Sequence, residues 1–127
     1  MIYGIGIDII EIERIKQSIE EYGERFLNKI FTKVEIDYSK NKSNMYQHLA
    51  ARFAAKEAIA KAISTGLNKS FSWQEVEIYN EPSGLPKVKL LGKLKEIVGI
   101  ERELKITMSH SDHYVCCFAV LCSITSI

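Results

Sequence analysis

The feature that most constrains the fold is an alanine-rich segment in the middle of the chain. Alanine has the highest intrinsic helix propensity of all residues. The segment predicts one long helix over 45–64, closed by Gly66 just past its end. Because alanine side chains are short, we expect another part of a structure to pack closely against this helix. The alanines of the segment are Ala50, Ala51, Ala54, Ala55, Ala58, Ala60 and Ala62.

Charged residues crowd the apolar face of this predicted helix. At about 100° per residue, Glu57 and Lys61 lie one turn apart at its edge, and Arg52 and Lys56 lie within or beside it. In the simplest interpretation, the cations extend to solvent and Glu57 forms an ordinary stabilising pair with Lys61, worth about 0.2–0.5 kcal/mol. The alternative is a functional site. The apolar face itself consists of Leu49, Phe53, Ile59, Ala60 and Ile63.

An acid follows the first apolar run of the chain. Residues 2–9 are rich in isoleucine and contain Gly4 and Gly6, a pattern typical of a buried strand that other backbone approaches closely. Asp8, which we expect at the end of this strand, either caps the following helix or acts as a ligand at the sheet edge. If the strand end meets the long helix, Asp8 and Glu57 supply two oxygen ligands of the kind that magnesium uses beside substrate phosphates.

The remaining pattern predicts an α+β fold class, with a small, mostly antiparallel sheet packed around the long central helix. No linker or repeat divides the chain, so we expect a single domain over 1–127. The other expected elements are an amphipathic helix over 11–30 broken near Gly23, a short helix opened by Thr32 and Glu35, a hairpin with strands around 76–78 and 88–90, a short helix over 91–98, and strands over 104–108 and 114–121.

Composition excludes several classes of protein. A chain of 127 residues that is 46% hydrophobic can bury a real core, which argues against disorder. A formal net charge of +1 is far from the basic balance of general nucleic-acid binders. No apolar run reaches the roughly 20 residues that span a bilayer, and the start of the chain lacks the features of a signal peptide.

The cysteines and two short motifs carry little functional signal. Cys116, Cys117 and Cys122 show no CxxC spacing, so we expect reduced, buried thiols in a cytoplasmic protein. The glycines at 4 and 6 lack the remainder of a dinucleotide or phosphate-loop motif. The segment SHSDH at 109–113 is either a polar hairpin turn or a ligand-contacting loop, and no nucleophile elbow accompanies it.

Four segments, in order and spacing, are similar to one family over nearly the full chain. They are GIGIDIIEIERI at 4–15, ARFAAKEAIAKAISTG at 51–66, NEPSGLPKV at 80–88 and TMSHSDHYV at 107–115. The most specific part is RFAAKEA. Together they resemble the holo-acyl-carrier-protein synthase family, the small bacterial 4'-phosphopantetheinyl transferases.

The resemblance implies an activity in fatty acid biosynthesis and its catalytic residues. Coenzyme A would donate its phosphopantetheine arm to a serine of apo acyl carrier protein, releasing adenosine 3',5'-bisphosphate, with magnesium as the metal. Asp8 matches the family's strand metal ligand, Glu57 its helix metal ligand, and Lys61 the lysine that contacts the reacting phosphate. We hypothesise that Glu57, directly or through a metal-bound water, accepts the serine proton.

The resemblance also implies where coenzyme A binds. Arg52, Gly84, Pro86, His110 and Ser111 match the positions that line the end carrying the adenine and the 3'-phosphate. Two departures fall near this end.

These departures are Ser64, where the family usually has glycine, and a 40–44 loop that is less basic than in relatives, with Lys40 and Lys42 as the available cations. Both bear on cofactor affinity and leave the metal ligands untouched.

Arg14 matches a family position that contacts the acidic carrier protein, and Arg25 and Lys29 extend that cationic surface. Family enzymes are homotrimers with shared active sites, which implies that the alanine-rich helix and the apolar C-terminal strand seat against a partner. In a monomer the alanines would simply favour the helix.

Three other hypotheses are weaker. The larger, two-lobed transferases need more than 127 residues. A non-catalytic module that binds coenzyme A or carrier protein has no use for Asp8, Glu57 and Lys61 together. An interaction protein that pairs through its charged helix is disfavoured by Lys56, which lies within the apolar face.

Overall fold

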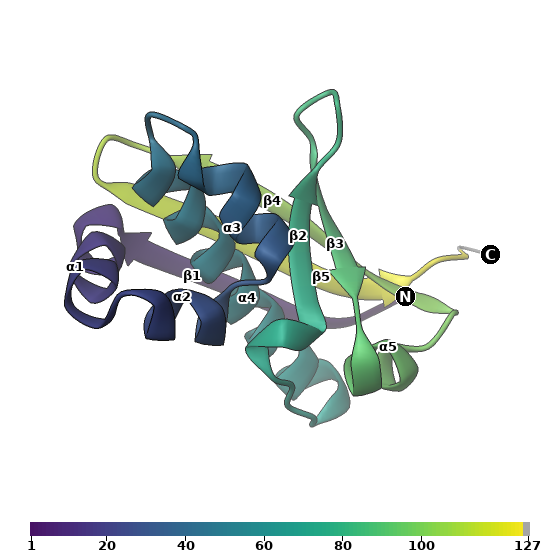
Figure 1. Cartoon of the computed structure of the whole chain (residues 1–127). Coiled ribbons are helices and arrows are strands. Elements are labelled where there is room, and N and C mark those ends of the chain that lie inside the picture. The colour runs from purple at the N-terminus through teal and green to yellow at the C-terminus, as the bar shows by residue number, and fades with distance from the viewer. Residues whose placement is uncertain (126–127) are drawn as a thin grey trace.

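The computed structural model describes residues 1–125 and confirms the α+β architecture (Figure 1). Helices fill most of the first half of the chain, and four of the five strands lie in the second half. The elements are β1 (Ile2–Glu11), α1 (Ile12–Tyr22), α2 (Glu24–Ile30), α3 (Lys33–Lys40), α4 (Met45–Leu67), the 3-10 turn η1 (Trp73–Glu75), β2 (Val76–Asn80), β3 (Pro86–Leu90), α5 (Gly92–Val98), β4 (Arg102–His110) and β5 (Tyr114–Ser123).

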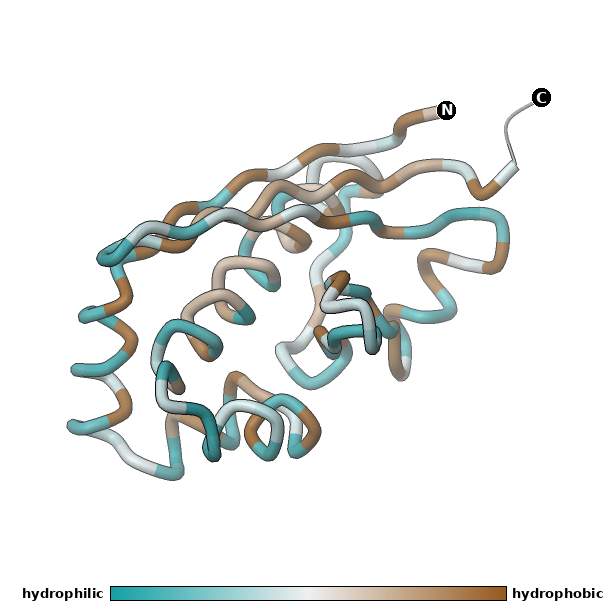
Figure 2. Tube along the Cα trace, turned by 90° about the horizontal axis from the view of Figure 1, so that it is seen from above, coloured by the Kyte–Doolittle hydropathy of each residue, from teal (hydrophilic) through white to brown (hydrophobic). Residues whose placement is uncertain are grey.

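The strands form two antiparallel sheets rather than one. The larger sheet has the order β1, β5, β4, so the first strand pairs with the last, and β2 and β3 form a separate hairpin. Figure 2 shows the three strands of the larger sheet side by side, with α4 beneath them. Helices α1 and α3 pack against α4 from its other sides. The predicted central position of the long helix is therefore confirmed.

Two glycines on the inner face of β1 allow α4 to lie against the strand. A Cβ atom at Gly4 would overlap the carbonyl oxygen of Ala62, and one at Gly6 would overlap that of Ala58. The close approach predicted for this strand is confirmed. Asp8 follows Gly6 on the same inner face, because successive side chains of a strand alternate between faces. The glycines thus bring Asp8 up to the helix.

The small alanine side chains of α4 also contribute to this close packing. Ala54, Ala55, Ala58 and Ala62 are fully buried within this one chain. These four alanines therefore pack inside the chain, and the expectation that they seat against a partner is wrong for them. None of the helices described in residues 1–125 is long and apolar enough to cross a membrane.

Two predicted boundaries are wrong, each for a local reason. β1 does not end at Asp8 but continues to Glu11, because pairing with β5 extends to the Glu11–Tyr114 register. Helix α4 passes through Gly66 and ends at Leu67, and its C-cap Asn68 takes the left-handed conformation with φ 52°. Gly66 is needed inside the helix, where a Cβ atom would lie 2.8 Å from the carbonyl oxygen of Tyr3.

Other local predictions are confirmed. Thr32 and Glu35 form a reciprocal capping box at the start of α3. Gly23, with φ 59°, separates α1 from α2, as the predicted break requires. The hairpin β2–β3 and the short helix α5 also lie where the pattern placed them.

The outer face of the larger sheet is apolar. Ile5, Ile7 and Ile9 of β1 are each more than half exposed, and the register places Tyr114 and Phe118 of β5 on the same face. The inner residues of both strands are buried against α4. A contiguous apolar surface of this kind is uncommon on a monomeric protein.

The three cysteines are free, as predicted, but only one is fully buried. Cys117 faces the core, where burial, reinforced by Cys116 and Asp8, raises the pKa of its thiol to about 12. Cys116 and Cys122 are half-buried, so the prediction of burial is wrong for these two. The reason is strand alternation, which turns both toward the outer face of β5.

Candidate active site

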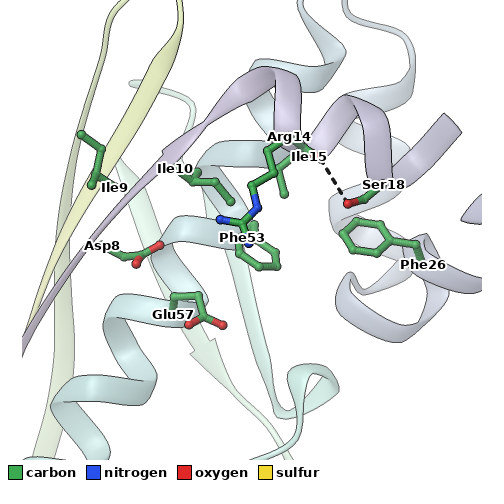
Figure 3. A pocket seen from close by; sticks show the side chains of 9 residues that line it. All are labelled: Asp8, Ile9, Ile10, Arg14, Ile15, Ser18, Phe26, Phe53 and Glu57. Atoms are coloured by element: carbon green, nitrogen blue, oxygen red, sulfur yellow. Dashed lines mark hydrogen bonds between the residues drawn. The ribbon is translucent and has the colours of Figure 1, made fainter. Parts of the chain in front are cut away.

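Two carboxylates line one cavity where β1, α1 and α4 meet. The cavity has a volume of about 300 Å³. Figure 3 shows Asp8 on β1 and Glu57 on α4 beside the same space, with the guanidinium of Arg14 pointing into it. The structure thus brings together side chains that lie far apart in the sequence. The lining residues are Asp8, Ile9, Ile10, Arg14, Ile15, Ser18, Phe26, Phe53 and Glu57.

The backbone explains why these two acids meet. Asp8 lies inside β1, opposite Cys117 of β5, and its side chain shares the inner face with Gly6. Gly6 touches α4 at Ala58, the residue after Glu57. The alternative that Asp8 caps the first helix is wrong, because Glu11 occupies the N-cap position of α1.

Lys61 lies beside the acids, one helical turn after Glu57. Its Nζ donates a hydrogen bond of 2.8 Å to the carbonyl oxygen of Ile7 and lies 3.4 Å from Oδ1 of Asp8. Burial and the charge of Asp8 raise the pKa of Glu57, and the ammonium group of Lys61 opposes this rise. The ammonium group therefore offsets only part of the repulsion between the carboxylates, and a further cation would stabilise the pair.

The chemistry of this donor set fits a hard divalent cation. Two half-buried carboxylates face one cavity, and magnesium is held by one or two carboxylates, with waters and substrate phosphates completing its shell. Within residues 1–125, no group of three or more His, Cys, Asp or Glu side chains is arranged to hold a metal. That excludes from the described residues the many-ligand arrangement typical of a structural zinc site.

Lys56, the neighbour of Glu57, does not reach solvent. Its side chain is 0% exposed and its Nζ lies 2.7 Å from Oε1 of Glu35. Nζ also donates to the carbonyl oxygens of Ile30 (2.8 Å) and Trp73 (2.9 Å). The simplest interpretation of the helix charges is therefore wrong for Lys56, which is a buried cation with a full set of acceptors.

Glu35 extends this buried ion pair into a network. Its carboxylate accepts hydrogen bonds from the backbone N–H groups of Thr32 (2.8 Å) and Ile78 (2.7 Å). The hydroxyl of Thr32 donates in turn to Glu77 (2.7 Å). The Lys56–Glu35 pair thus joins α3, α4 and β2 at the centre of the molecule.

Arg52 is also buried, at 1% exposure, and is linked to the β2–β3 turn. Its Nη2 donates to Oδ1 of Asn80 (2.7 Å), and Nδ2 of Asn80 donates to the carbonyl oxygen of Gly84 (3.0 Å). Its Nη1 reaches the carbonyl oxygen of His48 at 3.4 Å, and the guanidinium lies 4.5 Å from the centre of the Tyr38 ring. The direct contact predicted between Arg52 and coenzyme A stays a prediction.

The other residues predicted for the coenzyme A end lie in two turns. Gly84 and Pro86 belong to the β2–β3 connection, where Gly84 takes a positive φ of 94°. His110 ends β4 and Ser111 follows it, with the Ser111 hydroxyl accepting from the N–H of Tyr114 (3.2 Å). Their contacts with coenzyme A stay predictions.

Several cations cluster near Arg52. Burial, followed by the charges of Arg52, Lys42 and His110, lowers the pKa of His48. Lys42 also lies 4.5 Å from the centre of the Tyr38 ring, which the Arg52 guanidinium approaches at the same distance. The part of α4 around His48 and Arg52 is therefore cationic, whereas Glu57, further along the helix, lies near a second carboxylate.

Sequence reasoning missed two aromatic residues of the cavity and the link through Asn80. Phe53 precedes Glu57 by one helical turn, so it could have been placed on the same helix face from spacing alone. Phe26 had no such signal, because only tertiary packing brings α2 to the cavity. Asn80 was predicted only as the first residue of the segment that joins the two hairpin strands.

Taken together, the fold and the site define an α+β protein whose paired carboxylates and lysine lie where a strand crosses a long helix. The chain belongs to the 4'-phosphopantetheinyl transferase superfamily, because the model of that family matches residues 4–119. The resemblance drawn from the sequence motifs is confirmed.

Relatives and solved structures agree with this assignment. The chain is 48% identical over 120 residues to the holo-[acyl-carrier-protein] synthase of Protochlamydia amoebophila, covering 94% of this chain and 98% of that protein. The crystal structure of the Neisseria meningitidis holo-[acyl-carrier-protein] synthase matches with a TM-score of 0.85 and 33% identity, covering 95% and 98% of the two chains. The Bacillus anthracis synthase, solved in complex with CoA (3',5'-ADP), matches with a TM-score of 0.74 and 34% identity, covering 95% and 96%.

Proposed function

We propose that the chain is a holo-acyl-carrier-protein synthase. It transfers the 4'-phosphopantetheine group of coenzyme A to a serine hydroxyl of apo acyl carrier protein and releases adenosine 3',5'-bisphosphate, a step of fatty acid biosynthesis. The observation that carries the proposal is the convergence of Asp8 and Glu57 on one cavity, with Lys61 beside them, in a chain of this superfamily.

The transfer is an in-line displacement at phosphorus, in which positioning and charge stabilisation supply most of the catalysis. The serine oxygen forms a bond to the phosphorus nearest the pantetheine, and the bond from that phosphorus to the bridging pyrophosphate oxygen breaks. Glu57, whose raised pKa suits a proton acceptor, takes the proton of the serine hydroxyl. Lys61 stabilises the negative charge on the transferred phosphoryl group.

Asp8 and Glu57 would hold a magnesium ion. When bound, the ion neutralises charge on the pyrophosphate of coenzyme A. The support is the donor set itself, because two carboxylates in one cavity repel each other and Lys61 contacts only Asp8 among them. In this proposal Asp8 acts only as a metal ligand, whereas Glu57 also takes the proton.

Coenzyme A would extend from the acids to the cationic part of α4 around His48 and Arg52. Arg52, Gly84, Pro86, His110 and Ser111 would line its adenine and 3'-phosphate. The cations around His48 support this orientation, because a phosphate binds preferentially where positive charge gathers.

Acyl carrier protein would dock beside the cavity, at Arg14 of α1. Arg14 is exposed on α1 and points toward the two acids, so it reaches both the solvent and the site of transfer (Figure 3). Replacing Arg14 with glutamate should weaken binding of carrier protein, most strongly at low salt, and leave coenzyme A binding unchanged. Equal loss of both would contradict this docking role.

The enzyme would work as a homotrimer with shared active sites. The support is the apolar outer face of β1 and β5, where Ile5, Ile7 and Ile9 are exposed. Light scattering should give about three times the chain mass, and Ile7→Asp should lower it. Ile100→Asp is the matched control, because Ile100 is exposed outside this face. A wild-type chain that stays monomeric would contradict the trimer.

The three free cysteines support a reducing compartment, the cytoplasm, as the place of action.

Mass spectrometry of apo acyl carrier protein tests the proposed function directly. With this chain, coenzyme A and magnesium, the carrier protein should gain about 340 Da, the mass of a phosphopantetheine group, and chelation should abolish the gain. A carrier protein that binds but gains no mass would instead indicate a non-catalytic module.

A further inference from the structure

Asn80 occupies an unusual position between the long helix and the β2–β3 turn. It is the last residue of β2, and its side chain amide uses both of its ends. The oxygen accepts from Nη2 of Arg52 at 2.7 Å, and the nitrogen donates to the carbonyl oxygen of Gly84 at 3.0 Å. One side chain therefore connects a buried cation on α4 with the far side of the turn.

The helix side of this link is buried. Arg52 is 1% exposed, and its guanidinium packs on the ring of Tyr38. Its Nε has no hydrogen-bond partner among the described residues, and its Nη1 contact with the His48 carbonyl is long at 3.4 Å. The bond to Asn80 is therefore the shortest hydrogen bond that this guanidinium makes. A buried arginine in that situation holds its partner strongly.

On the turn side of the link, Asn80 adds a hydrogen bond to the backbone bonds that close the turn. The turn closes through two backbone hydrogen bonds, from Gly84 N–H to the carbonyl of Glu81 (2.7 Å) and from Glu81 N–H to the carbonyl of Leu85 (2.9 Å). Gly84 takes a positive φ, and a glycine there leaves the turn conformationally free. The amide of Asn80 fixes the direction of the Gly84 carbonyl and so limits that freedom.

The position of Arg52 on α4 gives this link a functional meaning. Arg52 precedes Glu57 by five residues on one continuous helix, which corresponds to about 7.5 Å along its axis. A turn tied to Arg52 is therefore held at a constant distance from Glu57 and Lys61. In the proposed function, Arg52 lies toward the adenine and 3'-phosphate of coenzyme A, and Glu57 and Lys61 lie beside its pyrophosphate.

We propose that Asn80 is a positioning residue for coenzyme A. By joining Gly84 to Arg52, Asn80 holds the Glu81–Leu85 turn in the conformation that binds coenzyme A. This inference rests on the proposed function, because the turn matters only if coenzyme A binds there. Asn80 does not touch the acids of the cavity. Its loss should therefore weaken coenzyme A binding without slowing the transfer step.

Two substitutions separate the two halves of the link. Asn80→Asp keeps an acceptor for Arg52 but loses the N–H donor to Gly84, and Asn80→Ala loses both. Both variants should raise the KM for coenzyme A about tenfold and leave kcat within about twofold. Asn28→Ala, at an exposed position of α2, is the matched control and should leave both constants unchanged.

Hydrogen exchange gives a readout that does not depend on activity. The amides of Glu81 and Gly84 should exchange faster in Asn80→Asp than in the wild type, while the amides of α4 keep their protection. If Asn80→Asp does not fold, Asn80→Ser provides the same test, since its shorter side chain cannot span both partners.

Three outcomes would overturn the inference. An unchanged KM for Asn80→Asp with an active wild type refutes the positioning role alone and leaves the proposed function intact. A fall in kcat with an unchanged KM indicates a general structural defect and also refutes it. A wild-type chain that does not modify carrier protein overturns the proposed function together with this inference.

Discussion

Lys56 and Glu57 are neighbours on α4, yet the structure places them in opposite environments. Lys56 is fully buried and has three oxygen acceptors within 2.9 Å. Glu57 lines an open cavity and lies near a second carboxylate, so Lys61 compensates its charge only in part. A buried charge with a full set of hydrogen-bond partners stabilises the fold, whereas a partly compensated charge beside a cavity can bind a ligand.

The two sides of α4 differ in the same way in how many hydrogen bonds their charged residues make. The buried side holds the Lys56–Glu35 network, which joins three elements through hydrogen bonds. The cavity side holds Glu57 and Lys61, which make few bonds to the rest of the chain. Substitutions on the buried side should therefore change stability, and those on the cavity side should change catalysis.

The largest expected effect is that of Lys56→Ala. Removing the ammonium leaves Glu35 as an uncompensated buried charge, which should lower the free energy of unfolding by about 3–5 kcal/mol. Chemical denaturation measures this change. Lys95→Ala, at an exposed position of α5, is the control and should stay within about 0.5 kcal/mol of the wild type. A loss below about 1 kcal/mol for Lys56→Ala would show that the buried ion pair is not needed for stability.

The next effect is that of Glu57→Gln on catalysis. The substitution keeps the shape but removes the charge, so turnover should fall at least about a hundredfold, or about 2.7 kcal/mol of barrier. The unfolding free energy should be unchanged or higher, because repulsion with Asp8 is relieved. Steady-state kinetics and denaturation test the two halves, with Glu96→Gln on α5 as the control. Near-normal turnover together with normal metal affinity would contradict the role of Glu57.

A smaller catalytic effect is expected for Lys61→Ala. If Lys61 acts on the transferred phosphoryl group, turnover should fall at least about tenfold, or about 1.4 kcal/mol. Its side chain is half exposed, so the stability should change little. Lys69→Ala, an exposed lysine just after α4, is the kinetic control. A loss confined to KM would show that Lys61 contributes equally to ground-state and transition-state binding.

The smallest effect is expected for His48, whose side chain is half-buried. Burial and neighbouring cations lower its pKa below the ordinary value of 6.5, so the folded state favours the neutral imidazole. Its contribution to stability is present above that value and is lost as the pH falls below it. Between about pH 7.5 and 5.5, His48→Gln should therefore lose less unfolding free energy than the wild type.

His113→Gln, in the exposed β4–β5 turn, is the control for this titration and should keep the wild-type pH dependence. If the free energy of unfolding depends on pH equally in His48→Gln and the wild type, protonation of His48 does not destabilise the folded state.

Much of the local structure was predictable because it depends on neighbouring residues. The capping box of Thr32 and Glu35, the break at Gly23 and the hairpin at 80–86 all follow from short-range rules of helix capping and turn formation. The boundary errors have the opposite origin. β1 extends to Glu11 because of a strand that lies about a hundred residues later, which no local pattern reveals.

For the candidate site, the residues were predictable and their relations were not. Motif resemblance selected Asp8, Glu57 and Lys61, but residue spacing alone left Asp8 open between a helix cap and a ligand. Lys56 was expected to reach solvent, because periodicity cannot show that Glu35 of another helix will be buried beside it. The role of Asn80 could be recognised only from its two hydrogen bonds in the folded structure.

The long helix, the order of helices and strands and the chemical groups of the site could be predicted from the amino-acid sequence, since they depend on composition and spacing along the chain. Which charges are compensated and which face a cavity followed only from the folded structure. The physical reason is that charge compensation depends on distances between elements, and the contact of Gly6 with Ala58 brings Asp8 to Glu57.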